Sequence, residues 1–558
     1  MRPSSSVVLS LFSMLVAISC FDANMPDRNT MDGGADTDTD ADADADADTD
    51  VDTDTDADTD ADTDTDTDTD TDSDTDADTD TDSDTDTDSD TDTDTDSDTD
   101  TGAASGSYQW HTFYGSSWAD GGYAVAVDGS GDVYLLGYAQ GAWTGPGGEA
   151  PLHAYSGTSN LFVLKLSEPG AYQWHTFYNA PNGSGIQMAV DGSGDVYVTG
   201  YCTSTWTGPG GEAPLHAYSG TGNLFVLKLS TAGAYQWHTF YGAAETSAYS
   251  IAAGASGEVV VTGESTASWT GPGSVSPLHA FSSSAGSRDA FVLDLSAAGA
   301  YQWHTFYGDG TEYGYAIAVS SGDVYVAGQS GNSWTGPSGE GPLHGHSSMT
   351  NTDAFVLKLG AAGAYQWHTF YGAAGMSTQT SGTAIAVDGG VVYVAGDGNV
   401  TWNGPTGETP LNAYEGTTGN LNLFALSLST SGAYQWHAFY GAPGADYGLS
   451  VEADGSGGAW VAGYSDGGWT GPGGEAALHA YSGGTDAFVL RLSAAGAYQW
   501  HTFYASSGSE SGGTVAGDGS GALYLGGTSN GTWDGPGGEA PLHAYSDNYE
   551  AFVLKLAQ

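Results

Sequence analysis

Short apolar runs recur along the chain after residue 101, each bounded by Gly, Ser, Asp or Asn. In the first copy they occupy residues 108–114, 124–128, 132–138 and 161–167, and all four are rich in β-branched and aromatic residues. Runs of this length and composition predict β-strands. No stretch of this region repeats its apolar residues with the 3.6-residue period of a helix. We therefore expect an all-β fold.

The four runs form a unit that repeats. The sequence Tyr-Gln-Trp-His begins at residues 108, 172, 235, 301, 365, 434 and 498, at intervals of 63 to 69 residues. A fixed period of this length, rich in Gly and aromatic residues, indicates a radial or solenoid β architecture. A short Asp-Gly-Ser-Gly-Asp turn joins the second run to the third, and a long segment joins the third to the fourth. Four strands in each of seven units predict a seven-bladed β-propeller.

The order of the runs also predicts how the ring closes. If the Ala-Val-Asp run is innermost, Tyr-Gln-Trp-His-Thr-Phe-Tyr is the outermost strand of every blade. The last blade then has three strands of its own, at about 514–518, 522–527 and 551–556. We expect residues 108–114 to supply its fourth strand, because this removes the open edge. The alternative is an open array with an exposed aromatic edge.

Two segments of the first unit resemble a known repeat. The sequences GYAVAVDGSGDVYLLGYA (122–139) and LFVLKLSEPGAYQWHTFYNA (161–180) are similar to the bacterial β-propeller repeat called SBBP. The resemblance covers residues 108–558, although Trp-Thr-Gly-Pro stands where that family tends to have an Asp-Phe-Pro-like stretch. It implies a propeller in the cell envelope and brings no activity and no catalytic residues.

The first twenty residues predict export. Residues 1–19 read as a signal peptide, with Arg2 followed by an apolar run from Val7 to Ile18 that is too short to span a bilayer. The ending Ala-Ile-Ser-Cys resembles a bacterial lipobox, with Ala17 in place of the usual Leu. The resemblance implies lipid attachment at Cys20 and a membrane-anchored protein. The alternative is a secreted protein with a leftover thiol.

The next segments predict a spacer. A short segment at 20–35 precedes residues 36–100, in which every even position is Asp. Such a sequence cannot bury apolar surface and repels itself, so we expect a disordered acidic stalk, with a reach on the order of 200 Å. It could instead collect cations or carry O-linked sugars. The net charge of −62 excludes nucleic acid as a partner. The propeller is expected over residues 105–558.

The basic residues after position 101 are few and periodic. Five of the six occupy one equivalent position in the fourth apolar run, where we expect a packed stem with its charge at the rim. Only Arg288 lies elsewhere. The five are Lys165, Lys228, Lys358, Arg491 and Lys555.

The histidines are periodic as well. Seven of the 14 lie in the outer strands, six lie in Pro-Leu-His or its variants, and His346 is the last. Catalysis requires one asymmetric group of residues with tuned pKa values, whereas a residue present in every blade is first expected to pack. We therefore expect a protein that is not an enzyme and binds no cofactor.

The long segment between the third and fourth runs, WTGPGGEAPLHAY in the first copy, is the best candidate for a binding loop. We expect these loops to emerge on one face. Their Trp, Glu, His and Tyr side chains could stack on and hydrogen-bond a sugar, one shallow site per blade; the alternative is that they only pack. A metal is not expected, because two ligands per loop are too few. The candidate ligand-binding residues are Trp143, Glu149, His153, Tyr155, Trp206, Glu212, His216, Tyr218, Trp469, Glu475, His479, Tyr481, Trp533, Glu539, His543 and Tyr545.

Two blades depart from this loop pattern. Blade three reads Gly-Ser-Val-Ser at 273–276, and blade five has Asn412 in place of the histidine, so these two are expected to bind least. The Asp-Gly-Ser-Gly-Asp turns could hold calcium, but both carboxylates occur only in blades one and two, which favours a plain hairpin.

Together these features predict a function class. We expect a monomeric, non-enzymatic lipoprotein of the bacterial outer membrane or cell surface, whose propeller acts in adhesion or recognition. Multivalent glycan binding is one form that this role could take. The alternative is an envelope scaffold that binds another protein. A hydrolase or lyase with an unrecognised site ranks third.

Overall fold

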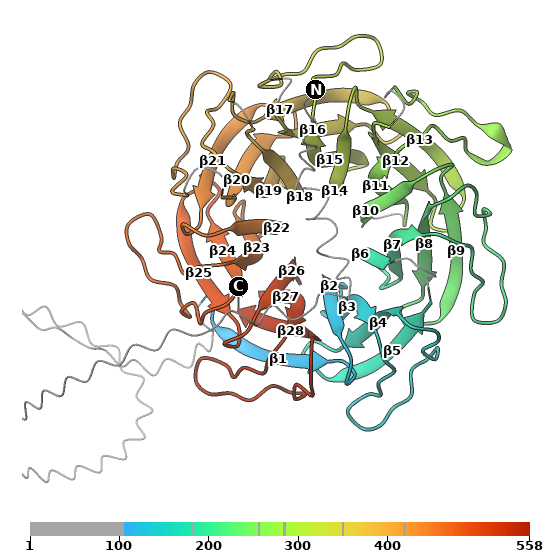
Figure 1. Cartoon of the computed structure of the whole chain (residues 1–558), viewed down its shortest axis with the longest axis vertical. Coiled ribbons are helices and arrows are strands. Elements are labelled where there is room, and N and C mark those ends of the chain that lie inside the picture. The colour runs from blue at the N-terminus through green and yellow to red at the C-terminus, as the bar shows by residue number, and fades with distance from the viewer. Residues whose placement is uncertain are drawn as a thin grey trace, which may run out of the picture. The chain divides into compact units, whose positions relative to one another are not determined.

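The computed structural model describes residues 105–557 apart from 180–183, 255–256, 283–285, 349–350, 376, 417–419 and 520. Within these ranges the chain forms strands β1 to β28, arranged in seven four-stranded sheets. The sheets stand radially around a central opening (Figure 1). The expected all-β, seven-bladed propeller is confirmed. The expected signal peptide, Cys20, the segment at 20–35 and the acidic stalk lie outside the described residues.

Each blade is an antiparallel sheet in which successive strands of the chain are ordered from the centre of the ring to its outer edge. Blades one to three are β2 (Asp120–Val127), β3 (Val133–Ala139), β4 (Asn160–Leu166) and β5 (Tyr172–Tyr178); β6 (Ser184–Val190), β7 (Val196–Cys202), β8 (Asn223–Leu229) and β9 (Tyr235–Tyr241); and β10 (Thr246–Ala253), β11 (Val259–Ser265), β12 (Asp289–Leu295) and β13 (Tyr301–Tyr307). Blades four and five are β14 (Glu312–Ser320), β15 (Asp323–Ser330), β16 (Asp353–Leu359) and β17 (Tyr365–Tyr371); and β18 (Thr380–Asp388), β19 (Val391–Gly398), β20 (Asn422–Ser429) and β21 (Tyr434–Tyr440). Blade six is β22 (Asp446–Ala453), β23 (Ala459–Ser465), β24 (Asp486–Leu492) and β25 (Tyr498–Tyr504).

The seventh blade combines the two ends of the described chain. Strands β26 (Glu510–Gly517), β27 (Ala522–Ser529) and β28 (Glu550–Ala557) are completed by β1 (Tyr108–Tyr114). β1 runs antiparallel to β28, with Trp110 opposite Lys555 and Tyr114 opposite Ala551. In Figure 1 the blue β1 lies along the red β28 at the outer edge of the ring. The predicted closure is confirmed.

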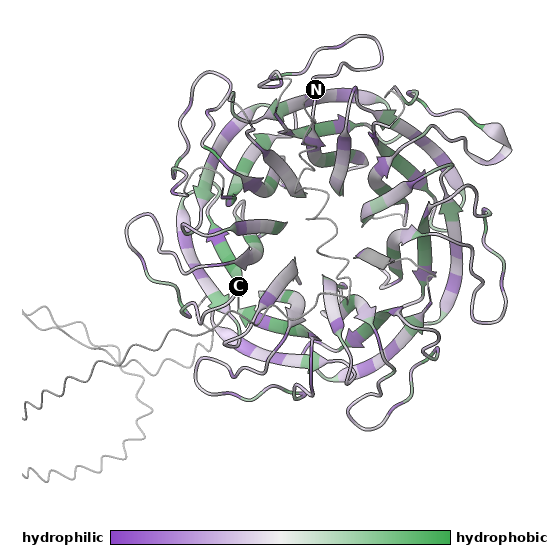
Figure 2. Ribbon diagram, viewed as in Figure 1, coloured by the Kyte–Doolittle hydropathy of each residue, from purple (hydrophilic) through white to green (hydrophobic). Residues whose placement is uncertain are grey.

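The core lies between neighbouring blades. Its apolar clusters each contain side chains from two successive sheets; one joins Trp110 and Val553 of blade seven to Leu135 and Phe162 of blade one. Strand β4 is buried along its whole length, and the middle strands carry most of the apolar colour in Figure 2. Burying both faces of every blade explains why these strands read as continuous apolar runs.

The periodic basic residues lie elsewhere than expected. Lys165 is 7% exposed, and its Nζ lies 2.8 Å from Asp132 and 4.7 Å from the ring centroid of Tyr134. For Lys165, and likewise for Lys228 and Lys358, the expectation of a charge at the rim was therefore wrong, because these lysines are buried. A nearby carboxylate and an aromatic face offset the cost of removing the charge from water. The other two basic residues at this position, Arg491 and Lys555, are half-buried.

No helix within the described part of the chain is both long and apolar enough to cross a membrane.

Candidate functional site

The tryptophans of the repeated loops lie inside the ring wall. The indole of Trp143 stacks on the imidazole of His175 in the same blade, with centroids 3.9 Å apart, and Trp143 is 7% exposed. The equivalent pair Trp206 and His238 has the same 3.9 Å separation. All seven loop tryptophans are buried in this way; they are Trp143, Trp206, Trp269, Trp334, Trp402, Trp469 and Trp533. Their stacking faces are thus already used by the protein itself.

The Pro-Leu-His part of each loop runs along the outermost strand. The amide of Leu152 donates to the carbonyl of His175 at 2.9 Å, and the amide of Phe177 donates to the carbonyl of His153 at 3.1 Å. Each loop joins the third strand of its blade to the fourth, so the loops all leave the ring on one face, as expected. They then extend outward at the rim (Figure 1). They pair with an edge that would otherwise be open to another chain.

The loop histidines serve this contact. Nδ1 of His153 donates to the carbonyl of Phe177 at 2.6 Å, and the imidazole stacks on Tyr178. In blade five Nδ2 of Asn412 donates to the carbonyl of Phe439 at 2.7 Å. Since the amide reproduces the bond, the position requires a hydrogen-bond donor and not an imidazole.

The remaining loop candidates are placed as follows. Glu149 is exposed, and its carboxylate accepts a 2.8 Å bond from the amide of Gly147 within the turn. Tyr155 is half-buried, with its ring edge against Phe177. The four loops that keep the full pattern share these environments, so Trp is buried, His and Tyr are half-buried, and Glu alone is exposed. The residues concerned are Trp143, Trp206, Trp469 and Trp533; Glu149, Glu212, Glu475 and Glu539; His153, His216, His479 and His543; and Tyr155, Tyr218, Tyr481 and Tyr545.

The histidines of the outer strands are fully buried and held in one tautomer. Nε2 of His175 lies 3.2 Å from the carbonyl oxygen of Trp143, so this nitrogen carries the proton. Nδ1 therefore accepts from the hydroxyl of Tyr172 at 2.7 Å. Burial lowers the pKa of His175 to about 4. These imidazoles are neutral packing groups, as expected for residues present in every blade.

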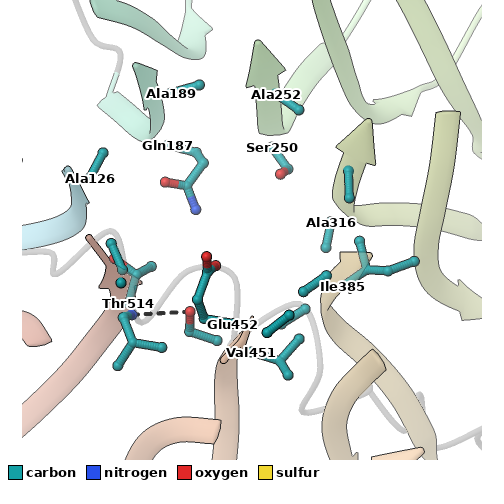
Figure 3. A pocket seen from close by; sticks show the side chains of 18 of the residues that line it. Ala126, Gln187, Ala189, Ser250, Ala252, Ala316, Ile385, Val451, Glu452 and Thr514 are labelled. Atoms are coloured by element: carbon teal, nitrogen blue, oxygen red, sulfur yellow. Dashed lines mark hydrogen bonds between the residues drawn. The ribbon is translucent and has the colours of Figure 1, made fainter. Parts of the chain in front are cut away.

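The inner strands of the blades surround a central channel. Its volume is about 640 Å³, and the inner strands line it mainly with Ala, Val and Ile. Glu452 stands where the other blades have alanine, as at Ala126, and Figure 3 shows Glu452 and Gln187 pointing into the cavity from opposite sides. Burial, together with the charge of Asp388, raises the pKa of Glu452 to about 7.

Several positions that vary between the copies lie together at the end of the channel where the inner strands begin. Here Tyr249 donates to Glu264 Oε1 at 2.8 Å, and Arg288 forms an ion pair with the same oxygen. The guanidinium lies 5.8 Å from the ring centroid of Tyr313, which stacks on Tyr315 at 5.5 Å. We call this group, together with Gln329, the tyrosine cluster.

The tyrosine cluster reaches the channel. Tyr315 lines the cavity and donates to Gln329 Oε1 at 3.2 Å; its ring also lies 5.7 Å from that of Tyr249 in the preceding blade. All three tyrosines, Tyr249, Tyr313 and Tyr315, are partly exposed. The cluster therefore offers aromatic and charged groups at the mouth of the channel.

A buried carboxylate extends this irregular region into blade five. Asp397 is fully buried, and neither of its oxygens has a hydrogen-bond partner in the structure. Burial raises the pKa of Asp397 to about 7. The pKa of Tyr447 is raised to about 12, mainly by burial and then by the charge of Asp397. Asp397 occupies the register position of Glu264 and Gln329 in the preceding blades.

Sequence reasoning missed this cluster. The search was for residues that recur in every copy, and such a search passes over residues that differ between copies. One signal was present, since Arg288 was recognised as the only basic residue outside the repeated position. Aligning the seven copies and asking where they disagree would have brought Glu264, Gln329 and Asp397 together.

Comparison with known proteins adds little to this picture. No family model matches the chain, and no curated protein matches it. Solved structures similar to it include a Bacteroides caccae protein of unknown function (9% identity, 69% of this chain and 93% of that chain, TM-score 0.32). Others are the C-terminal WD40 domain of Sif2 (7%, 81% and 99%, 0.34) and an endosialidase of phage phi92 (8%, 81% and 69%, 0.34). At these identities and TM-scores the likenesses carry no information on function.

Proposed function

We propose that this protein is a non-enzymatic recognition protein whose propeller binds a partner protein at the tyrosine cluster. The observation that carries the proposal is the group of aromatic and charged side chains in the tyrosine cluster at this end of the channel. Tyr and Arg are the residue types enriched at the centres of protein interfaces. Partly exposed aromatic rings next to an ion-paired arginine supply both apolar contact and hydrogen bonding.

The rest of the ring supports a binding role over a catalytic one. The imidazoles of the outer strands are buried, neutral and alike in every blade, and the loop histidines bond to backbone carbonyls. Glycan binding through the repeated loops has weaker support, because the indole faces that would stack on a sugar are covered. Glycan binding at the tyrosine cluster would use the same aromatic rings, and the experiment below separates it from protein binding.

We also propose that the propeller is displayed at the bacterial cell envelope. The export signal and the lipobox-like sequence at Cys20 support lipid anchoring, and the acidic tract at 36–100 supports a spacer. Substituting Cys20→Ser should abolish acyl labelling and release the protein from membranes. Retention of the label would remove the lipid anchor from the proposal.

The test of recognition compares two sites on one protein. The chain from residue 105 onward serves as bait for envelope extracts and as probe on a glycan array. The wild type should capture a partner protein that the double variant Tyr313→Ala and Tyr315→Ala does not capture. Glu149→Ala and Glu212→Ala, in the exposed loops, should still capture it. Loss with the loop variants, or binding only to glycans, would overturn the protein-binding proposal.

A further inference from the structure

One position of the repeat holds a cation in five of the seven blades, and in three of them the cation is buried. In blades one, two and four the Nζ of Lys165, Lys228 and Lys358 lies 2.8 Å from a carboxylate at the start of the preceding strand. The same ammonium groups lie 4.7 to 5.1 Å from the ring centroid of a tyrosine. Arg491 and Lys555 occupy the same position but have other acidic partners, Asp454 in the same blade and Glu168 in blade one.

Blade three inverts this arrangement. Asp294 pairs with Val260 in the register in which Lys165 pairs with Tyr134. The basic residue has thus become a carboxylate and the aromatic ring has become a smaller aliphatic side chain. Glu258 remains at the position of the acidic partner, so two acidic side chains face a place from which an ammonium and a phenol ring are missing.

A pocket occupies this place. Its volume is about 380 Å³, and it is lined by both acids and, from the next blade, by Val319 and Val324. Asp294 is 8% exposed and its Oδ1 has no hydrogen-bond partner. A buried carboxylate oxygen without a partner is costly. Burial and the charge of Glu258 raise the pKa of Asp294 to about 7, and the nearby indole of Trp303 offsets only part of this rise.

The other blades show which group satisfies such a pocket. Four of them place there an ammonium on a four-carbon stem, with its charge on a carboxylate. Two carboxylates are too few for calcium, which takes six to eight oxygen ligands. The valines at 260, 319 and 324 supply an apolar wall for a stem.

We propose that the blade-three pocket, formed around Asp294 and Glu258, binds an external alkylammonium group in place of the lysine that four other blades carry. The ligand is either a small primary amine or a lysine side chain presented by another molecule; the chemistry is the same. The pocket lies at the end of β14 that carries Val319, whereas the tyrosine cluster uses the end that carries Tyr313. The proposal therefore does not depend on the proposed function.

The test titrates the full chain with n-butylammonium as the probe and detects binding by ligand-observed NMR. Wild-type protein should show saturable binding that n-butanol does not reproduce. Asp294→Lys supplies the residue found in four other blades; it should fill the pocket, weaken binding at least tenfold and raise the melting temperature. Diffuse binding to the acidic tract is common to all variants and cancels in the comparison.

Two further measurements make the outcome decisive. Lys228→Ala opens the equivalent position in blade two and should add a second saturable site, which shows that the probe can report such a pocket. Acetyl-lysine-methylamide, with a free side-chain amine, should bind if the source is a lysine side chain and should fail if it is a free amine. Unchanged binding in Asp294→Lys, or binding of calcium that displaces the amine, would overturn the proposal.

Discussion

The amide of Gly106 donates a hydrogen bond of 2.8 Å to the carbonyl of Ala557. The amide of Ala557 donates in turn to the carbonyl of Ser107 at 2.8 Å. In blade one the continuous turn between β4 and β5 makes the same two bonds, from Gly170 to Ser167 and from Ser167 to Ala171. The two ends of the described chain therefore rebuild, without a covalent link, the turn that the other blades form within one segment.

Removing the first strand should destabilise the whole ring. A chain that begins at residue 115 loses Trp110, Phe113 and Tyr114, which are buried against neighbouring blades, and each contributes about 2–3 kcal/mol by burial. We expect its melting temperature to lie about 10 °C or more below that of a chain beginning at residue 105. Differential scanning calorimetry measures both. Equal melting temperatures would show that the closure does not contribute to stability.

Gly106 should resist substitution by a residue with a side chain. Its φ is +80°, and an added Cβ would lie 2.7 Å from Cδ1 of Leu478. Gly106→Ala should lower the free energy of unfolding by about 1–2 kcal/mol, because it combines left-handed strain with a close contact. Urea unfolding gives the value. Gly129→Ala, where no atom lies within 4 Å of the added Cβ, is the matched control and should change little.

The loop histidine should be replaceable by asparagine but not by alanine. His153→Asn restores the donor that Asn412 supplies in blade five, so we expect its free energy of unfolding to stay within about 0.5 kcal/mol of the wild type. His153→Ala leaves the carbonyl of Phe177 without its side-chain donor and should cost about 1–2 kcal/mol. Similar losses in both variants would mean that stacking on Tyr178 is the main contribution.

Asp397 should make stability depend on pH. Its carboxyl has a pKa of about 7 in the folded protein against an ordinary 3.8, so between about pH 4 and 7 the unfolded chain is ionised while the folded chain keeps the proton. The contribution of this group to stability is therefore complete below pH 4 and is lost as the pH rises to 7.

Asparagine should remove that dependence. Asp397→Asn should raise the free energy of unfolding, relative to the wild type, by about 3 kcal/mol more at pH 8 than at pH 4. Chemical unfolding at the two pH values measures the difference. Asp534→Thr, at an exposed loop position where other blades have threonine, should show no such difference. A pH-independent effect of Asp397→Asn would mean that the carboxyl ionises normally in the folded protein.

The architecture could be predicted from the sequence because each strand repeats seven times and the period is regular. The closure followed from the order of the strands, since β28 needed a partner that only residues 108–114 could supply. The burial and the contacts of individual side chains were harder to predict. The sequence left open whether Trp143 is an exposed platform or a packed side chain. The structure shows that its loop returns along the outer strand and stacks the indole on His175.

The irregular sites escaped prediction for another physical reason. Lys165 was expected at the rim because an unpaired ammonium belongs in water, and only the fold brings Asp132 and Tyr134 around it. Asp294 then stood out in the structure as the residue that lacks this arrangement. Charges that depend on partners from separate strands can be placed only when the register of those strands is known.

The closure by β1 also determines where mechanical load enters the ring. Any pull on the chain before residue 105 is transmitted first to β1, which is held to β28 by hydrogen bonds and has no covalent link to it. Ser105 accepts bonds from the guanidinium of Arg491 at 2.8 Å and the indole of Trp500 at 3.1 Å. These two side chains of blade six brace the first described residue, so a tether pulling on this end would strain the joint between blades six and seven before any other.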